Sequence, residues 1–97
     1  MKKVLVNVSF GGFALDDEYY ADAMAREGGP DNIREDEVLI ALVEQGKDIG
    51  DVCSSISIAE IPDNATDFVI ESDSDGREYV LYVVDGKIKQ AENKCYL

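Results

Sequence analysis

Apolar and polar side chains alternate at the start of the chain, which is typical of a β-strand. The apolar positions of segment 3–10 recur every second residue and would share one face: Val4, Val6, Val8 and Phe10. We therefore predict a strand from Lys3 to Phe10 with one fully apolar face, ended by the pair Gly11-Gly12.

The segment that follows has the start and stop signals of a helix. Three acidic residues, Asp16, Asp17 and Glu18, are favourable in a first helical turn because the N-terminus of a helix is positively polarised. Gly28-Gly29-Pro30 would end the helix. We predict a helix from Asp16 or Asp17 to Glu27. Three residues form its expected core face: Tyr20, Ala23 and Met24.

A second helix is predicted from about Glu35 to Gln45, with Gly46 as its C-cap. Leu39, Leu42 and Val43 stand at i, i+3 and i+4, the spacing of one helical face. The continuous apolar run 38–43 would also suit a buried strand, and this alternative stays open.

The second half of the chain has the pattern of a sheet. The expected strands are Ser55–Ile61, Asp67–Ser72, Glu78–Val84 and a short edge strand around Ile88. Asp75-Gly76 and Asp85-Gly86 are typical of tight hairpin turns. The segment from 78 to 84 is apolar on both faces, so we expect it in the interior of a sheet that is covered on both sides.

The predicted fold class is α+β, in the order β-α-α-β-β-β-β. Two helices would pack on a four- to five-stranded, mainly antiparallel sheet, and residues 1–97 would form a single acidic domain. The first apolar run breaks at Asn7, and no segment approaches the roughly 18 apolar residues that span a bilayer. We therefore expect a cytoplasmic protein that does not bind membranes.

Charge restricts the partners more than any motif does. The chain has 21 acidic and 9 basic residues and no histidine, which gives a net charge of −12. Such a field repels nucleic acid and anionic lipid and attracts basic surfaces. We expect no direct binding of nucleic acid, and we predict an acidic partner-binding surface made of Asp16, Asp17, Glu18, Asp22, Glu35, Asp36, Glu37, Asp73 and Asp75.

Catalytic chemistry has no visible basis in the sequence. Without histidine, the serines lack the usual base that activates a nucleophile. Cys53 and Cys95 lack the spacing of a redox pair or a zinc site, and we interpret them as buried thiols, with a disulfide as the alternative. Segment 71–76 resembles the opening of a calcium loop, but Tyr82 stands where a glutamate would be needed, so a hairpin tip is favoured. No catalytic residue, metal or cofactor is predicted.

A strand followed by Gly11-Gly12-Phe13 and a helix is the feature most similar to a ligand site. Glycines before a helix can bring backbone N–H groups onto a phosphate. The third glycine and the lysine of known phosphate loops are missing, and three carboxylates follow in the first helical turn. A tight structural turn is the favoured interpretation, and ligand binding is the alternative.

Several short motifs resemble a family of small uncharacterised bacteriophage and prophage proteins. These are Lys3-Val4-Leu5-Val6-Asn7, then Gly11-Gly12-Phe13 with Leu15-Asp16, and later Leu42-Val43-Glu44 and Ala59-Glu60-Ile61-Pro62-Asp63 before an Asp-Gly hairpin. The likeness covers about two thirds of the chain. It implies a phage origin and brings no assigned chemistry with it.

Acidic phage proteins without catalytic residues are often inhibitors of host defence. We therefore expect a non-enzymatic inhibitor, in the form of an anti-CRISPR protein that mimics nucleic acid and blocks the basic groove of a host effector. The alternatives are a protein that binds a nucleotide immune signal at Gly11-Gly12-Phe13, and a phage structural or assembly module. A monomer and a homodimer are both compatible with the sequence.

Overall fold

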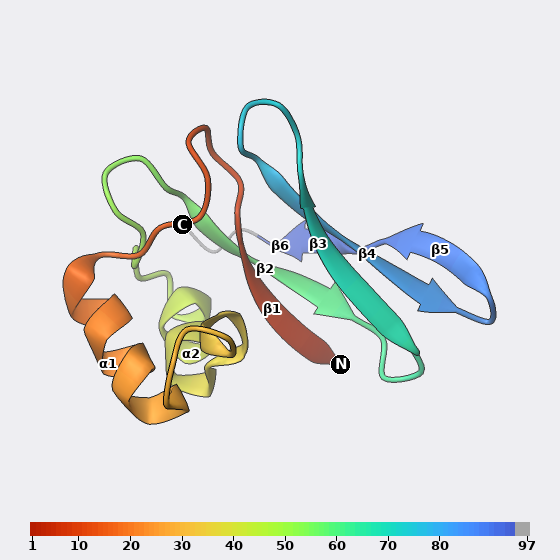
Figure 1. Cartoon of the computed structure of the whole chain (residues 1–97), viewed down its shortest axis with the longest axis horizontal. Coiled ribbons are helices and arrows are strands. Elements are labelled where there is room, and N and C mark those ends of the chain that lie inside the picture. The colour runs from red at the N-terminus through yellow and green to blue at the C-terminus, as the bar shows by residue number, and fades with distance from the viewer. Residues whose placement is uncertain (95–97) are drawn as a thin grey trace.

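The computed structural model describes residues 1–94, which form two helices and six strands (Figure 1). In chain order the elements are β1 (Lys2–Asn7), α1 (Asp17–Glu27), the 3-10 turn η1 (Ile33–Glu35), α2 (Glu37–Glu44), β2 (Ile56–Ile61), β3 (Asp67–Ser72), β4 (Glu78–Val84), β5 (Lys87–Gln90) and β6 (Glu92–Lys94). The strands form two antiparallel sheets, β1-β2-β6 and β3-β4-β5.

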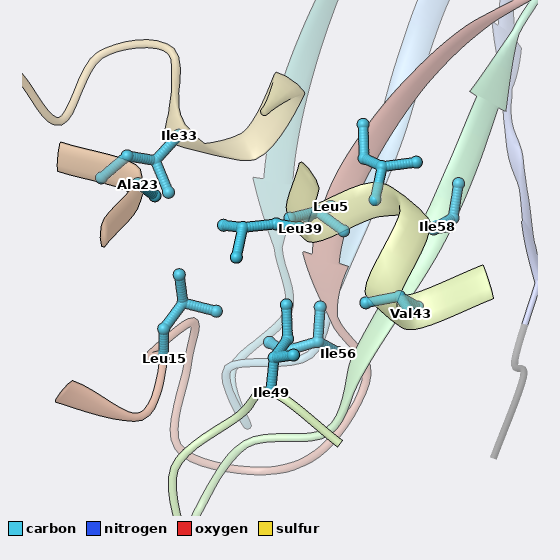
Figure 2. Close-up of a cluster of buried hydrophobic side chains, with 10 residues drawn as sticks. Leu5, Leu15, Ala23, Ile33, Leu39, Val43, Ile49, Ile56 and Ile58 are labelled. Carbon is cyan, nitrogen blue, oxygen red and sulfur yellow. The ribbon is translucent and has the colours of Figure 1, made fainter. Parts of the chain in front are cut away.

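The β1-β2-β6 sheet is the middle of three layers. On one face, Leu5 and Ile58 pack with residues of both helices, among them Leu39 of α2 (Figure 2). On the other face, Val4 and other side chains of β1 and β2 pack against Val80 and its neighbours in the β3-β4-β5 sheet. Alternation along a strand thus supplies two separate apolar clusters from one sheet.

The predicted α+β class and the order of its elements are confirmed, but the prediction of one sheet is wrong. The chain adds a sixth strand, β6, which follows β5 of the β3-β4-β5 sheet (the outer sheet) and pairs with β2 of the other sheet. The hydrophobic pattern of a sequence predicts which side chains are buried, but it does not predict which strands pair with one another. The three polar residues of β6 offer no periodic signal at all.

The strands that are covered on both faces, β1 and β2, do not include the one we expected. Four consecutive residues of β1, from Val4 to Asn7, are buried, whereas β4 buries only Val80 fully. β4 does lie in the interior of its sheet, between β3 and β5. Its second face lies on the outside of the molecule, so only the first part of that prediction is confirmed.

Both predicted helices are present, and the strand alternative for 38–43 is excluded. Leu39, Ile40 and Val43 are the buried residues of α2. In α1 the residue that packs on the core beside Ala23 and Met24 is Tyr19, whereas Tyr20 is 43% exposed. The expected core face of α1 was therefore wrong by one residue in its first turn.

Two further expectations about burial are corrected. Phe10 does not extend the apolar face of β1, because the strand ends at Asn7 and the Phe10 side chain is 64% exposed. Cys53 is an exposed free thiol in the loop before β2, not a buried one. Cys95 lies outside the described residues.

Candidate functional site

The nine acidic residues predicted to bind a partner fall into three separate groups in the structure. The first group lies on the N-terminal half of α1 and consists of Asp16, Asp17, Glu18 and Asp22, all of them exposed. Asp16 is the N-cap and accepts a hydrogen bond from the backbone N–H of Glu18 at 3.2 Å. Within residues 1–94, none of the four makes an ion pair with a basic group. We call these four residues the α1 acidic face.

The second group lies where the C-terminus of α1 meets the N-terminus of α2. Here Asp36 is buried, with 1% of its side chain exposed. Its carboxylate accepts two hydrogen bonds from Arg26, at 2.9 and 3.1 Å, and one from the backbone N–H of Leu39 at 2.9 Å. Asp36 therefore caps α2 and ties it to α1, and its prediction as a surface contact is wrong.

The neighbours of Asp36 on the sequence do reach the surface. Glu37 is exposed in the first turn of α2. Glu35 forms an ion pair with Lys2 at 3.0 Å, which removes part of its field. Of this predicted group, only Glu37 remains an exposed carboxylate without an ion pair in the described part of the chain.

Glu27, the last residue of α1, was missing from the predicted site. Its side chain is hydrogen-bonded to Asp36, and this bond raises the pKa of Glu27 because only the protonated carboxyl can donate. Burial opposes ionisation of Asp36, but the hydrogen bonds from Arg26, Leu39 and Glu27 outweigh it, so the pKa of Asp36 is lowered. The sequence predicts that Glu27 lies at the end of a helix. It does not predict the hydrogen bond to Asp36, 9 residues later, because the fold brings these two residues together.

Replacing Glu27 with glutamine is expected to stabilise the protein at neutral pH. A carboxyl with a raised pKa in the folded state contributes stability at low pH, and this contribution is lost as the pH rises through the folded-state pKa. Glutamine keeps a donor toward Asp36 at every pH. Thermal unfolding should therefore show a higher Tm for Glu27→Gln than for the wild type at pH 7, with the difference shrinking toward pH 4.

Glu37→Gln is the control. It removes one negative charge from the same junction between the helices, but Glu37 is not hydrogen-bonded to Asp36. It is expected to give no gain, since Glu37 is favourable in the first turn of α2. Equal shifts for the two variants at both pH values would contradict the shared proton between Glu27 and Asp36.

The third group lies in the turn between β3 and β4, apart from α1 in Figure 1. Asp73 accepts hydrogen bonds from the backbone N–H groups of Asp75 and Arg77, at 2.9 and 3.1 Å, and from the Arg77 guanidinium at 3.2 Å. Although partial burial disfavours the charged carboxylate, these bonds lower the pKa of Asp73. Arg77 also pairs with Asp75 at 3.4 Å, so this group is largely engaged within its own turn.

The Gly11-Gly12 turn packs against that hairpin. The backbone N–H of Gly11 donates to the carbonyl of Asp75 at 3.0 Å, and the Gly76 backbone lies so close that an added Cβ would be 2.7 Å from the Gly12 nitrogen. The Arg34 guanidinium lies 3.9 Å above the ring of Phe13. The turn thus joins parts of the fold, and one of the amides that a phosphate would need is already bonded.

Comparisons of the chain with protein-family models, curated proteins and solved structures found no match. Within residues 1–94 no group of three or more histidine, cysteine, aspartate or glutamate residues is placed to hold a metal ion. Nor does that part of the chain contain a helix long and apolar enough to cross a membrane. Of the three predicted acidic groups, the α1 acidic face is the one whose carboxylates are all exposed and without an ion pair in the described part of the chain.

Proposed function

We propose that this protein is a phage-encoded inhibitor of host defence, an anti-CRISPR protein whose α1 acidic face occupies the basic nucleic-acid groove of an effector. One observation carries the proposal. The only basic residue of α1, Arg26, is bonded to the buried Asp36, and it forms no ion pair with Asp17, Glu18 or Asp22. Exposed carboxylates on a rigid helix can stand in for phosphates against lysines and arginines.

Charge density on this helix also suits fast binding. Long-range attraction between an acidic protein and a basic groove raises the association rate and makes it depend steeply on salt. Glu37 and Asp31 are exposed carboxylates near the far end of α1, and neither makes an ion pair within the described residues. They would extend the negative field beyond the α1 acidic face.

The nucleotide-binding alternative gains no support from the Gly11-Gly12 turn, because its Gly11 amide is bonded to Asp75. The assembly-module alternative has no observation in its favour. We therefore take the inhibitor as the proposed function.

The test compares two triple variants that lose the same charge. Asp17→Asn, Glu18→Gln and Asp22→Asn neutralise three residues of the α1 acidic face and leave the N-cap Asp16 in place, while Glu71→Gln, Asp85→Asn and Glu92→Gln neutralise exposed acids on β3, in the turn between β4 and β5, and on β6. Each variant competes with fluorescent DNA for a panel of purified CRISPR effectors, at about 50 and 300 mM salt. Asp36 is left unchanged because it is buried.

We expect the α1 variant to inhibit about tenfold less well than the wild type, and the control variant to stay within about twofold. Higher salt should weaken the wild type strongly and the α1 variant less. Equal losses for the two variants would contradict a specific role of α1, and a wild type that displaces no DNA from any effector would contradict the proposed function.

A further inference from the structure

The β3-β4-β5 sheet exposes an apolar face on the side away from the rest of the molecule. In the observed register, Val69 of β3 pairs with Leu81 of β4, and Val83 of β4 pairs with Ile88 of β5. Directly paired residues point to the same side of a sheet, and so do residues two apart on one strand. These four side chains, which we call the outer apolar face, therefore form one contiguous patch.

The outer apolar face is not covered by any described part of the chain. Val69 is 48% exposed and Ile88 is 73% exposed, while the opposite face of the same sheet packs on β1 and β2. A shallow hollow of about 100 Å³ lies on the patch, lined by all four residues together with Asp67, Phe68 and Tyr82. Exposed apolar patches of this kind mark interaction sites, and a hollow in such a patch can bind an apolar side chain of a partner.

The rim of this patch is acidic. Asp67 pairs with Val83, and Glu71 pairs with Tyr79, so both carboxylates share the outer side of the sheet. Neither makes an ion pair within residues 1–94. The lysines of β5, Lys87 and Lys89, pair with the alternate residues of β4 and so belong to the other side.

We propose that the outer apolar face is a second docking surface, whose occupant is a protein with an apolar surface ringed by lysines and arginines. Charge complementarity selects this occupant. A second copy of the chain would bring Asp67 and Glu71 against their own equivalents, between two molecules that each carry a charge of −12. The surface is distinct from the α1 acidic face, because the β1-β2-β6 sheet lies between the helices and the outer sheet (Figure 1). It does not rest on the proposed function.

Two synthetic peptides serve as probes, one alternating leucine with lysine and the other alternating leucine with glutamate. Each is titrated into the isotopically labelled protein at about 50 mM salt, and binding is mapped from amide shifts in two-dimensional NMR spectra. Val69→Lys places a positive charge in the patch. Val38→Lys is the matched control, since Val38 on α2 is 47% exposed and Val69 is 48% exposed.

We expect the lysine peptide to shift the amides of β3, β4 and β5 saturably, and the glutamate peptide to leave them unchanged. Val69→Lys should weaken this binding about tenfold or more, and Val38→Lys less than about twofold. The neutralised α1 variant described above should retain the shifts, which separates this surface from the proposed function.

Three outcomes would overturn the proposal. Shifts confined to α1 would show that the lysine peptide responds to charge alone. Equal binding of the two peptides would remove the preference for a basic rim. Dimerisation in sedimentation experiments, abolished by Val69→Lys, would identify a second copy as the occupant instead.

Discussion

Replacing Arg34 with methionine is expected to lower the free energy of unfolding by about 3–5 kcal/mol, because it leaves a poorly exposed carboxylate without its partner. The Arg34 guanidinium bonds to both carboxylate oxygens of Glu78, at 2.7 and 2.8 Å, and Glu78 has only 10% of its side chain exposed. Arg34 also donates to the carbonyl of Leu5 at 3.1 Å, and Glu78 accepts from the backbone N–H of Asn7 at 2.8 Å. The pair thus satisfies backbone groups of β1 and links η1 to the outer sheet.

Arg77→Met is the matched control for Arg34→Met. Arg77 likewise contacts carboxylates, those of Asp73 and Asp75, and an aromatic ring, that of Phe10 at 5.3 Å, but half of its side chain is exposed. Exposed ion pairs contribute at most about 1 kcal/mol, so this variant should unfold near the wild-type urea midpoint. Equal losses for the two variants in urea unfolding would contradict a special role for the Arg34–Glu78 pair.

A double variant separates the loss of the Arg34–Glu78 ion pair from the cost of leaving the Glu78 carboxylate unpaired. Adding Glu78→Gln to Arg34→Met removes the unpaired carboxylate while keeping an oxygen that can accept from Asn7. The double variant should therefore be more stable than Arg34→Met alone. No recovery would mean that the cost of Arg34→Met comes from its contacts with Leu5 and Phe13 instead.

Local signals in the sequence predicted most individual elements correctly. The capping carboxylates of α1, the apolar spacing in α2 and the two Asp-Gly turns each act within a few residues, so they could be recognised without knowing the fold. The division into two sheets could not be recognised in this way. It depends on which strands become neighbours, and β1 would alternate in the same way beside any partner.

Asn7 shows why the sequence did not predict that β1 is covered on both faces. Its side chain is buried and connects three segments: it accepts from the backbone N–H of Ser55 at 3.0 Å and donates to the carbonyl of Gly76 at 3.1 Å. Sequence patterning assigns such a residue to solvent, because polarity alone does not reveal a partner 48 or 69 residues away.

The sequence predicted the position of some acidic residues of the candidate site but not which of them are buried. Exposed acids such as Asp17 and Asp22 could be placed from the helix they belong to. Asp36 and Glu37 are adjacent acids at the start of α2, yet Asp36 is the buried N-cap that also bonds to Arg26, whereas Glu37 is exposed. Charge counts therefore predicted the field of the molecule, while the fold decided which carboxylates produce it.

Replacing Gly76 with alanine is expected to destabilise the protein by about 2–5 kcal/mol, through two effects that a control can separate. The backbone of Gly76 has a φ of 88°, which costs about 1–2 kcal/mol with any side chain present. In addition, the new Cβ would lie 2.7 Å from the Gly12 nitrogen and 3.1 Å from the Gly11 nitrogen, and overpacking of this kind typically adds about 1–3 kcal/mol.

Gly86→Ala isolates the first effect, because Gly86 has a φ of 75° and nothing within 4 Å of an added Cβ. It should lose only the 1–2 kcal/mol of backbone strain. Hydrogen exchange gives a second readout, since the clash in Gly76→Ala would separate the hairpin from the Gly11-Gly12 turn and break the bond from Gly11 to Asp75. The Gly11 amide should therefore exchange faster in Gly76→Ala and at the wild-type rate in Gly86→Ala. Equal stability losses with no change at Gly11 would mean that the close approach of these two turns does not contribute to the stability of the fold.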